Sequence, residues 1–443
     1  MFIRHIRKIV LGTAVLAFVG CAGTASLKQT EIPKDAVTFL GAAVIPGGAG
    51  ATVDRSGLPH LLLEDGQSYN DAFDGFGSAI AYTGYGNRYL LLADRGPNKV
   101  QYQGGKEVDY TTSYFTRFQI ADIVVKQKGE GWDVSVSLVG TSLLRDEAGR
   151  NFIGISTAYR EANPEKNLRM DPEGIRVAPD GTVWISDEYG PVVYHFDQSG
   201  KRIGTLKLPE AFLIDKPASF LSEEMAQNKK GRYTNRGAEG LALSPDGKIM
   251  VVALQSALVQ DGGLSGLGTR FLVYDMTDTV KEPKQFVYLL DSTKMVVSEV
   301  LAVNDHLILV DERDSTGGPQ GVKRLYLIDL EQHPPPSDVS KVSALPKNGV
   351  PENITPLNKR LFADIGALLN AAAPYTTPAG LPDKIEGYAF GPDLPDGRRL
   401  LLATNDNYYA ETYPNYIFAF AVDPRALPGF QAVNLKPGVR FAP

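Results

Sequence analysis

A hairpin pattern that recurs along the chain constrains its fold more than any other feature. A typical copy has an opening acidic residue and a glycine, an alternating apolar run, a turn, a second apolar run and an acidic end. The copies occupy residues 75–96, 173–190, 239–256, 299–314 and 386–407, and the first of them lacks the opening glutamate. Runs that alternate at period two and are rich in β-branched and aromatic residues predict strands, so each copy predicts an antiparallel hairpin.

Further strands follow most of the hairpins. Third strands are expected at 192–197, 270–276, 323–330 and 416–423, and fourth strands at 202–209 and 284–291. Four-stranded units that repeat around an axis form a β-propeller, because one isolated blade cannot bury both of its faces. The sequence therefore predicts an all-β fold, a β-propeller of five or six four-stranded blades.

The segments outside the repeat decide the number of blades. A sixth blade would lie within 120–170 or 331–383, and a strand at about 37–44 would complete the last blade and close the ring. Three long stretches with partly helical periodicity interrupt the repeat, at 141–170, 211–236 and 351–383. Each of them precedes an opening glutamate, so we expect partly helical insertions on one face of the propeller.

The N-terminus is typical of an exported protein. A positive segment ending at Lys8 precedes an apolar stretch at 9–19, which is too short to span a bilayer. Residues 18–21 resemble a bacterial lipobox, in which Cys21 would be acylated and become the mature N-terminus. The alternative is an ordinary signal peptide with a bystander cysteine.

This interpretation divides the chain into a signal peptide at 1–20, a tether at 22–35 and a single β-propeller domain at 36–443. We expect a periplasmic or outer-membrane lipoprotein of a bacterial envelope that contacts the membrane only through its lipid. A net charge of −6 without a basic stripe argues against nucleic-acid binding. Because Cys21 is the chain's single cysteine, internal disulfides and multi-cysteine metal sites are excluded. The oligomeric state stays open.

The acidic ends of the copies are the candidate site. In a propeller the two ends of each inner hairpin lie at the same mouth of the ring, so residues far apart in the chain become neighbours there. The opening glutamates would line this mouth: Glu173, Glu239, Glu299 and Glu386. A second set of acids would lie just outside them: Asp187, Glu188, Asp311, Glu312, Asp314 and Asp406.

So many carboxylates together require positive charge, because like charges raise one another's proton affinity. Calcium takes six to eight oxygen ligands in flexible carboxylate-rich sites and fits this ring better than magnesium. Asn235, Asn405 and Asn407 would add neutral oxygens. The alternative is a purely structural role, in which acids at strand ends accept hydrogen bonds from backbone N–H groups of a neighbouring blade.

Cationic residues accompany most of the acids. They are Arg95, Arg169, Arg236, Arg313 and Lys384. They would serve either as counter-ions of the acidic ring or as a clamp for an anionic substrate.

Absent motifs narrow the chemistry further. The mature chain has four scattered histidines, and the sequence has no G-x-S-x-G elbow, H-E-x-x-H motif, P-loop or dinucleotide fingerprint. The mechanism that remains for a hydrolase is metal-assisted, with a carboxylate that takes a proton from water.

Three blocks carry a family resemblance. The segments at 169–191, 235–258 and 307–314 resemble the bacterial phytase-like family, also called the esterase-like activity of phytase family. The resemblance extends over about 36–425 and implies an exported or lipid-anchored propeller that hydrolyses phosphoesters or other esters. It adds as site candidates the family-block residues Asp171, Glu173, Asp187, Glu188, Arg236, Glu239, Glu312 and Arg313. The aspartate-rich block of β-propeller phytases is missing, so phytate is not the expected substrate. The acidic mouth is also similar, more loosely, to calcium-bound gluconolactonase propellers.

Together these observations predict a calcium-dependent hydrolase of a small phosphoester or other anionic ester. The expected catalytic residues are Glu173, Glu239, Asp187 and Glu188. The expected substrate-binding residues are Arg95, Arg236, Arg313 and Lys384. The expected metal ligands are Glu173, Glu239, Glu299, Glu386, Asp171 and Glu312. The alternatives are a non-catalytic module that binds an envelope protein or glycan, and a lactonase-type propeller.

Overall fold

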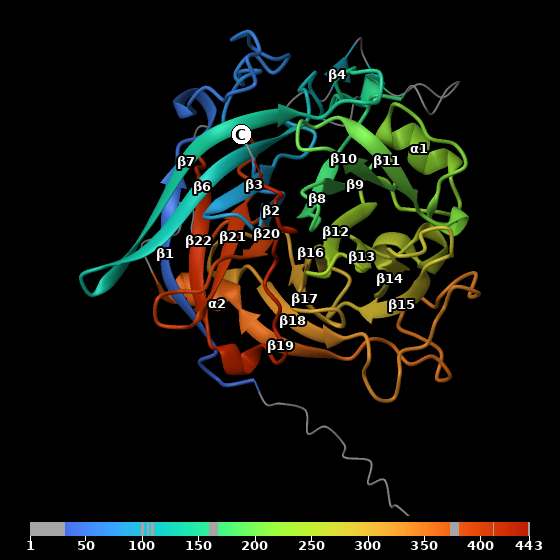
Figure 1. Ribbon diagram of the computed structural model, residues 1–443. Helices are drawn as coiled ribbons and strands as arrows, with labels where there is room; N and C mark the ends of the chain where they lie inside the picture. The colour runs from blue at the N-terminus through green and yellow to red at the C-terminus, as the bar shows by residue number, and fades with distance from the viewer. Residues whose placement is uncertain are drawn as a thin grey trace, which may run out of the picture. The chain divides into compact units, whose positions relative to one another are not determined.

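Five four-stranded antiparallel sheets succeed one another around a common axis in the computed structural model (Figure 1). The structure describes residues 32–98, 102–103, 106–107, 110–158, 167–372, 381–410 and 412–441. The expected signal peptide, Cys21 and most of the expected tether lie outside these residues. The predicted all-β propeller is confirmed, and its blades number five.

Each blade is built from strands in the order inner to outer. Blade 1 has β2 (Ala79–Tyr82), β3 (Arg88–Leu92), β6 (Arg117–Lys128) and β7 (Gly131–Leu143). Blade 2 has β8 (Pro172–Val177), β9 (Val183–Asp187), β10 (Val192–Phe196) and β11 (Arg202–Lys207). Blade 3 has β12 (Ala238–Leu243), β13 (Ile249–Leu254), β14 (Gly268–Asp275) and β15 (Lys284–Leu289). Blade 4 has β16 (Val296–Ala302), β17 (Leu307–Arg313), β18 (Lys323–Asp329) and β19 (Lys359–Asp364). Blade 5 has β20 (Ile385–Phe390), β21 (Arg399–Asn405), β22 (Asn415–Val422) and β1 (Val37–Ile45).

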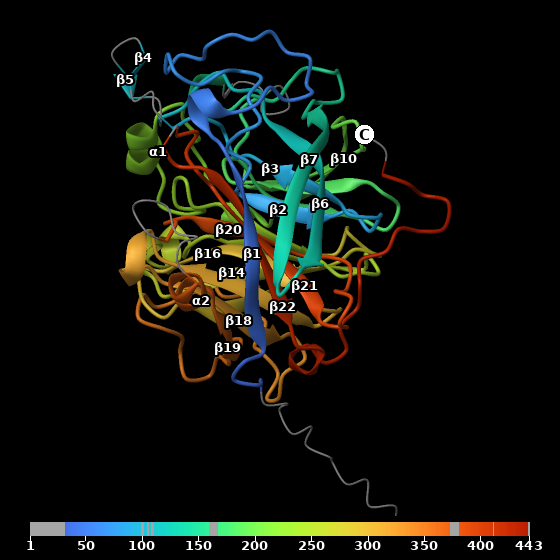
Figure 2. The same ribbon diagram turned by 90° about the vertical axis from the view of Figure 1, so that its left-hand side faces the viewer.

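The N-terminal strand closes the ring, as the sequence predicts. β1 pairs with β22 along its whole length, from Val37 opposite Val422 to Ile45 opposite Asn415. Figure 2 shows β1, in blue, at the outer edge of this sheet. Because the first strand of the chain completes the last blade, backbone hydrogen bonds rather than a loop join the two ends of the propeller.

The strands described in the two segments considered for a sixth blade belong to the five blades. Residues 120–170 contribute most of β6 and all of β7, the long outer hairpin of blade 1. Residues 331–383 contribute β19 and the short helix α2 (Ile365–Ala371). A second short helix, α1 (Leu221–Gln227), lies in the expected insertion at 211–236. Two further strands, β4 (Tyr102–Gln103) and β5 (Lys106–Glu107), form a small separate hairpin.

The core lies between neighbouring blades. The inner strands β2, β8, β12, β16 and β20 contact one another in a closed cycle. Inward side chains of adjacent blades interdigitate behind them, for example Val193 and Leu206 of blade 2 with Leu241 and Val252 of blade 3. Each such buried side chain stabilises the fold by about 1.5–3 kcal/mol. This packing explains why a blade is apolar on both faces: alternate residues of β22, such as Phe418 and Ile417, pack in different clusters.

A C-terminal strap, defined here as residues 428–441, ties blades together at the end where the hairpins turn. The N–H of Gln431 donates to the carbonyl of Val303 at 3.0 Å, and the N–H of Lys436 donates to that of Pro179 at 2.7 Å. Its last described side chain, Phe441, is fully buried. In Figure 1 the strap is the red segment that crosses the middle of the view. The acidic residues lie at the opposite ends of the inner strands, away from the strap.

Among the described residues, no helix combines the length and the apolarity needed to cross a membrane.

Candidate functional site

Register irregularities in the inner hairpins set the position of the acidic residues. In blade 5 the pairing steps from Ile385 to Gly387, which leaves Glu386 out of the ladder. The ladders of blades 2 and 3 show the same interruption, around Glu173 and Glu239. Such bulges re-aim a side chain. Three of the four opening glutamates therefore occupy one equivalent position in their blades.

Blade 4 differs by one residue. Its pairing steps from Val297 to Glu299, so Ser298 stands where the other blades have a glutamate. Glu299 stands at the position of the following glycine, such as Gly387 in blade 5. The structure therefore separates Glu299 from the other three glutamates.

Glu299 has its own partners deeper in the ring. Its carboxylate forms an ion pair of 2.8 Å with Arg176 and accepts N–H bonds from Val300 at 2.9 Å and Leu241 at 3.2 Å. Burial raises the pKa of Glu299 to about 7, and Arg176 opposes this shift. With these partners Glu299 holds blades 2, 3 and 4 together rather than facing the mouth.

Five carboxylates converge at the mouth. We call them the mouth cluster: Asp94, Asp171, Glu173, Glu188 and Glu239. Oxygen atoms of Glu173, Glu188 and Glu239 lie within 4.8 Å of one another, and so do those of Asp94, Asp171 and Glu173. Glu173 belongs to both groups and is thus the centre of the cluster.

Burial and mutual repulsion disfavour the charged forms of these acids. The pKa of Glu173 is raised well above its usual value by burial and then by the charge of Glu239. The pKa of Glu188 is raised well above its usual value by the same two causes. Burial raises the pKa of Glu239 to about 8, with a further contribution from Glu386. Such a cluster stores electrostatic repulsion that a bound cation would relieve.

The cluster has carboxylate oxygens that the described part of the protein leaves without hydrogen bonds. They are both oxygens of Glu188 and Oε2 of Glu239. These residues are only 1% and 2% exposed, respectively. Unpartnered buried carboxylates are costly, and hard cations such as Ca²⁺ bind groups of this kind. The donor set of Glu173, Glu188 and Glu239 therefore fits a divalent cation with oxygen preference.

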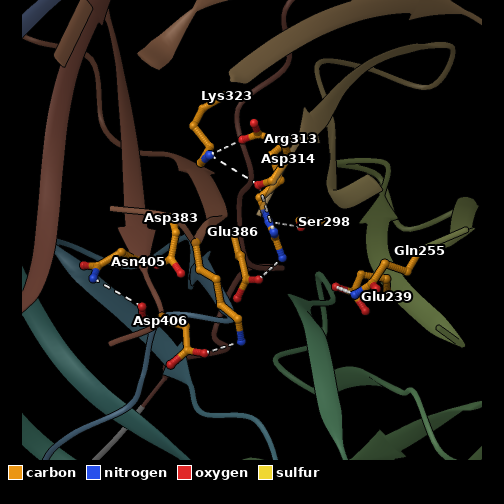
Figure 3. A network of polar contacts seen from close by, with 12 residues as sticks. Glu239, Gln255, Ser298, Arg313, Asp314, Lys323, Asp383, Glu386, Asn405 and Asp406 are labelled. Carbon is orange, nitrogen blue, oxygen red and sulfur yellow. Dashed lines mark hydrogen bonds and ion pairs between the residues drawn. The ribbon is translucent and has the colours of Figure 1, made fainter. Parts of the chain in front are cut away.

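Neighbouring residues hold the cluster in place. The Gln255 amide donates to Oε1 of Glu239 (Figure 3). Asp187 does not belong to either carboxylate group; it accepts the N–H of Asp171 at 2.9 Å and that of Tyr189 at 3.1 Å. Burial raises the pKa of Asp187 to about 7. Asp187 thus orders the backbone that carries Asp171.

Three of the expected substrate-binding cations are engaged by carboxylates. Arg95 lies 2.5 Å from Asp171, and Lys384 lies 2.7 Å from Asp406. Arg313 donates to Glu386 and, at 2.7 Å, to the Ser298 hydroxyl (Figure 3). The fourth, Arg236, has no carboxylate within 4.0 Å among the described residues.

Glu312 is placed away from the mouth cluster. Its carboxylate accepts hydrogen bonds from the Tyr288 hydroxyl at 2.7 Å, the Lys359 ammonium at 2.6 Å and the Asp291 N–H at 2.6 Å. Successive side chains of a strand point to opposite faces, so Glu312 and its neighbour Arg313 face different ways. Glu312 serves the contact between blades 3 and 4.

Five of the remaining expected residues also have partners, whereas both carboxylate oxygens of Asp311 are buried without a hydrogen bond among the described residues. Asn235 accepts from Arg95 at 2.6 Å, Asn405 from the N–H of Tyr416 at 2.6 Å, and Asn407 donates to Asp74 at 2.8 Å. The guanidinium of Arg169 stacks over Tyr189 at 4.2 Å. Asp314 pairs with Lys323 at 2.8 Å (Figure 3).

Asp94 is the member of the mouth cluster that sequence reasoning missed. Burial and the charges of Asp406 and Asp171 raise its pKa to about 8. The signal was the acidic end of the copy at 75–96, in which Asp94 follows an apolar strand as Asp187 does. This copy lacks the opening glutamate that marks the other four.

Comparisons with known proteins identify a matching family, a related sequence and similar solved structures. The family model described as "Phytase-like: Esterase-like activity of phytase" matches residues 71–408. Over 185 residues the chain is 33% identical to a protein of Arthroderma benhamiae described as an uncharacterized secreted protein, a match that covers 34% of this chain and 36% of that protein. Among solved structures, a luciferin-regenerating enzyme is 11% identical, with a TM-score of 0.33 and coverage of 89% of this chain and 100% of that one. A gluconolactonase of Xanthomonas campestris is 11% identical, with a TM-score of 0.32 and coverage of 86% and 98%.

Proposed function

This chain belongs to the phytase-like family, and from that premise we propose that it is a calcium-dependent hydrolase of phosphoesters or other anionic esters. The observation that carries the proposal is the pair of unpartnered, buried oxygens of Glu188 beside Glu173 and Glu239. A buried carboxylate that accepts no hydrogen bond is stabilised by a bound cation, so these oxygens favour a cation site.

The residues have distinct proposed tasks. Glu173, Glu188 and Glu239 would hold the cation, and Gln255 would orient Glu239. When bound, the cation would act as a Lewis acid toward the ester oxygen. Asp187 would position the Asp171 backbone rather than touch substrate.

A proton acceptor is available next to the proposed cation ligands. Asp94 adjoins Glu173 and accepts a backbone N–H from Gly96 at 2.8 Å. A general base works best when its pKa lies near the working pH, and the pKa of Asp94 is raised to about 8, chiefly by burial. We assign Asp94 as the group that takes the proton from the attacking water.

Calorimetric titration with Ca²⁺ tests the cation ligands. We expect Glu188→Gln to lose Ca²⁺ binding, because an amide replaces the unpaired carboxylate. Glu223→Gln is the matched control, since Glu223 is an exposed residue of α1 outside the cluster. Wild-type protein that binds no Ca²⁺ would contradict the proposal.

Turnover tests the chemistry separately. A panel of p-nitrophenyl esters, phosphoesters and lactones is assayed with Ca²⁺ and after chelation. We expect hydrolysis that chelation removes, and an Asp94→Asn variant that keeps Ca²⁺ binding but loses turnover. If Ca²⁺ binds and no substrate reacts, a non-catalytic module that binds a glycan or an envelope protein replaces the hydrolase.

We also propose export and lipid anchoring through Cys21. The basic and apolar segment before Cys21 supports this, and so does the description of the Arthroderma benhamiae relative as secreted. Labelling cells with a palmitate analogue tests it. Wild-type protein should carry the label, and Cys21→Ser should not.

A further inference from the structure

Arg236 is the cation at the mouth whose guanidinium has no carboxylate within 4.0 Å in the described part of the chain. The other three expected substrate-binding cations, Arg95, Arg313 and Lys384, each have such a partner. A guanidinium that is already paired has less charge to offer a substrate than one that is not. Arg236 is therefore the cation best able to receive an anion.

The backbone around Arg236 fixes it beside the mouth cluster. The N–H of Arg236 donates to the carbonyl of Tyr233 at 3.0 Å, which closes a tight turn. Asn235 within this turn has a left-handed φ of 53° and accepts from Arg95. Gly237 packs so tightly that an added Cβ would lie 2.1 Å from the carbonyl oxygen of Glu188. Asn235 and Gly237 flank Arg236, and their contacts therefore hold the Arg236 backbone next to Glu188.

Arg236 faces the carboxylates from beyond contact distance. Its charge lowers the pKa of Glu188 and of Glu239, although burial dominates both and raises them. Neither carboxylate forms an ion pair with it within the described residues. An anionic ester held by the proposed cation would therefore lie close to Arg236.

An apolar surface adjoins Arg236. We call it the apolar shelf: Met225, Tyr233 and Leu264. The Tyr233 hydroxyl lies 3.7 Å from the sulfur of Met225, and a Cβ at Gly263, the residue before Leu264, would lie 3.0 Å from the Tyr233 ring. Met225 is 41% exposed and Leu264 is 47% exposed. Clustered exposed apolar side chains beside a polar site favour binding of an apolar group.

We propose that Arg236 determines specificity for a substrate with a single negative charge next to the ester and an apolar substituent that rests on the apolar shelf. This inference rests on the proposed hydrolase function and names its substrate class. Phosphodiesters with one alkyl or aryl group meet both requirements. A phosphomonoester with two charges, or a polyphosphorylated compound, would bring more negative charge than the single guanidinium of Arg236 offsets.

The reaction balances without any further reactant. The oxygen of water forms the new bond to phosphorus, and one proton of that water passes to Asp94. The bond from phosphorus to the leaving oxygen breaks, and the proton held by Asp94 passes to this oxygen, so that the alcohol or phenol departs and Asp94 is regenerated. One diester and one water give one monoester and one alcohol or phenol.

Steady-state kinetics with matched substrates test the charge requirement. The substrates are methyl and octyl p-nitrophenyl phosphate, p-nitrophenyl phosphate and the neutral p-nitrophenyl butyrate, all with saturating Ca²⁺. We expect Arg236→Gln to raise KM for the diesters by about tenfold or more, since a charge-assisted hydrogen bond is lost. The variant should leave KM for the neutral ester unchanged, and Arg236→Lys should restore part of the affinity. Arg425→Gln, which alters an exposed arginine outside the site, is the matched control.

The same assay tests the apolar shelf. The octyl diester should have a lower KM than the methyl diester with the wild type, and Leu264→Ser should remove this difference. Circular dichroism and Ca²⁺ titration establish that each variant is folded and loaded. Faster turnover of p-nitrophenyl phosphate than of both diesters, or an equal loss on the neutral ester with Arg236→Gln, would overturn the inference. Absence of turnover with every substrate would instead remove the proposed function, and the inference with it.

Discussion

Arg176 on β8 reaches across the axis to Glu299 on β16, with 2.8 Å between Nη2 and Oε2. The same guanidinium donates to the carbonyls of Ile80 on β2 at 3.1 Å and Val300 on β16 at 2.8 Å. One side chain therefore joins blades 1, 2 and 4. The pair lies further along the inner strands than the mouth cluster and separates it from the strap end of the ring.

Breaking this pair should destabilise the propeller. In Arg176→Met the buried Glu299 loses its counter-charge, so the free energy of unfolding should fall by about 3–5 kcal/mol. Glu299→Gln should cost less, about 1–2 kcal/mol, because Arg176 keeps its carbonyl acceptors. Urea denaturation measures both. Arg425→Met, which disrupts an exposed pair with Asp423, should not differ from wild type.

Metal-free protein should lose stability as the pH rises. Burial raises the pKa of Glu239 from 4.5 to about 8 and that of Asp94 from 3.8 to about 8 in the folded state. The folded state then holds protons that the unfolded state has released, so the stability present below about pH 4 is lost progressively up to about pH 8. Thermal unfolding in a chelator at several pH values measures this decline.

Calcium should cancel that decline, because a cation takes over the role of the protons. The melting temperature should rise on addition of Ca²⁺, and more strongly at about pH 8 than at about pH 5. Glu239→Gln should flatten the pH dependence without the metal, whereas Glu223→Gln should leave it as in the wild type. Equal slopes for all three proteins would show that the mouth cluster is not its source.

Close approach of blades 1 and 5 depends on Gly77. An added Cβ there would lie 1.8 Å from the carbonyl carbon of Asn405 and 2.1 Å from the nitrogen of Asp406. We expect Gly77→Ala to yield little folded protein, because backbone atoms cannot yield to the methyl group. Gly86→Ala is a stringent control: its φ is +56° but its surroundings are open, so it should cost only about 1 kcal/mol. Soluble yield and melting temperature separate the two.

Removal of the Phe441 ring should weaken the strap end without affecting the mouth. Phe441 is fully buried, so Phe441→Ala should lower the free energy of unfolding by about 3–5 kcal/mol. Its neighbour Arg440 is exposed, and Arg440→Ala should have little effect. Calcium affinity should be the same in both variants. A parallel loss of Ca²⁺ binding in Phe441→Ala would mean that the two ends of the ring are coupled.

The architecture was predictable because it repeats. Each hairpin has the same order of acid, alternating strand and turn, so β8 with β9 and β12 with β13 were evident from the sequence. The number of blades was less accessible. The long strands β6 and β7 lack the acidic markers, so the sequence also allows them a blade of their own, whereas their pairing places them in blade 1.

The sequence predicts which segments carry the site, but not which of two adjacent residues in a segment faces it. A bulge leaves no mark on an alternating pattern, so the sequence could not tell that Ser298, not Glu299, takes the position of the glutamates. The partners of Glu312 come from β15 and β19, which no local motif connects to it. Distances between side chains of different blades are set by tertiary packing, and they decide which carboxylates share a site.

The pairing of Val37 with Val422 also has a consequence for biosynthesis. A nascent polypeptide presents β1 long before β22 exists, so the final blade is assembled only after β22 has been synthesised. Until then the growing molecule carries an open strand edge, which is a site for unwanted association. Cellular factors that shield such edges would act on this protein before β22, which begins at Asn415, appears.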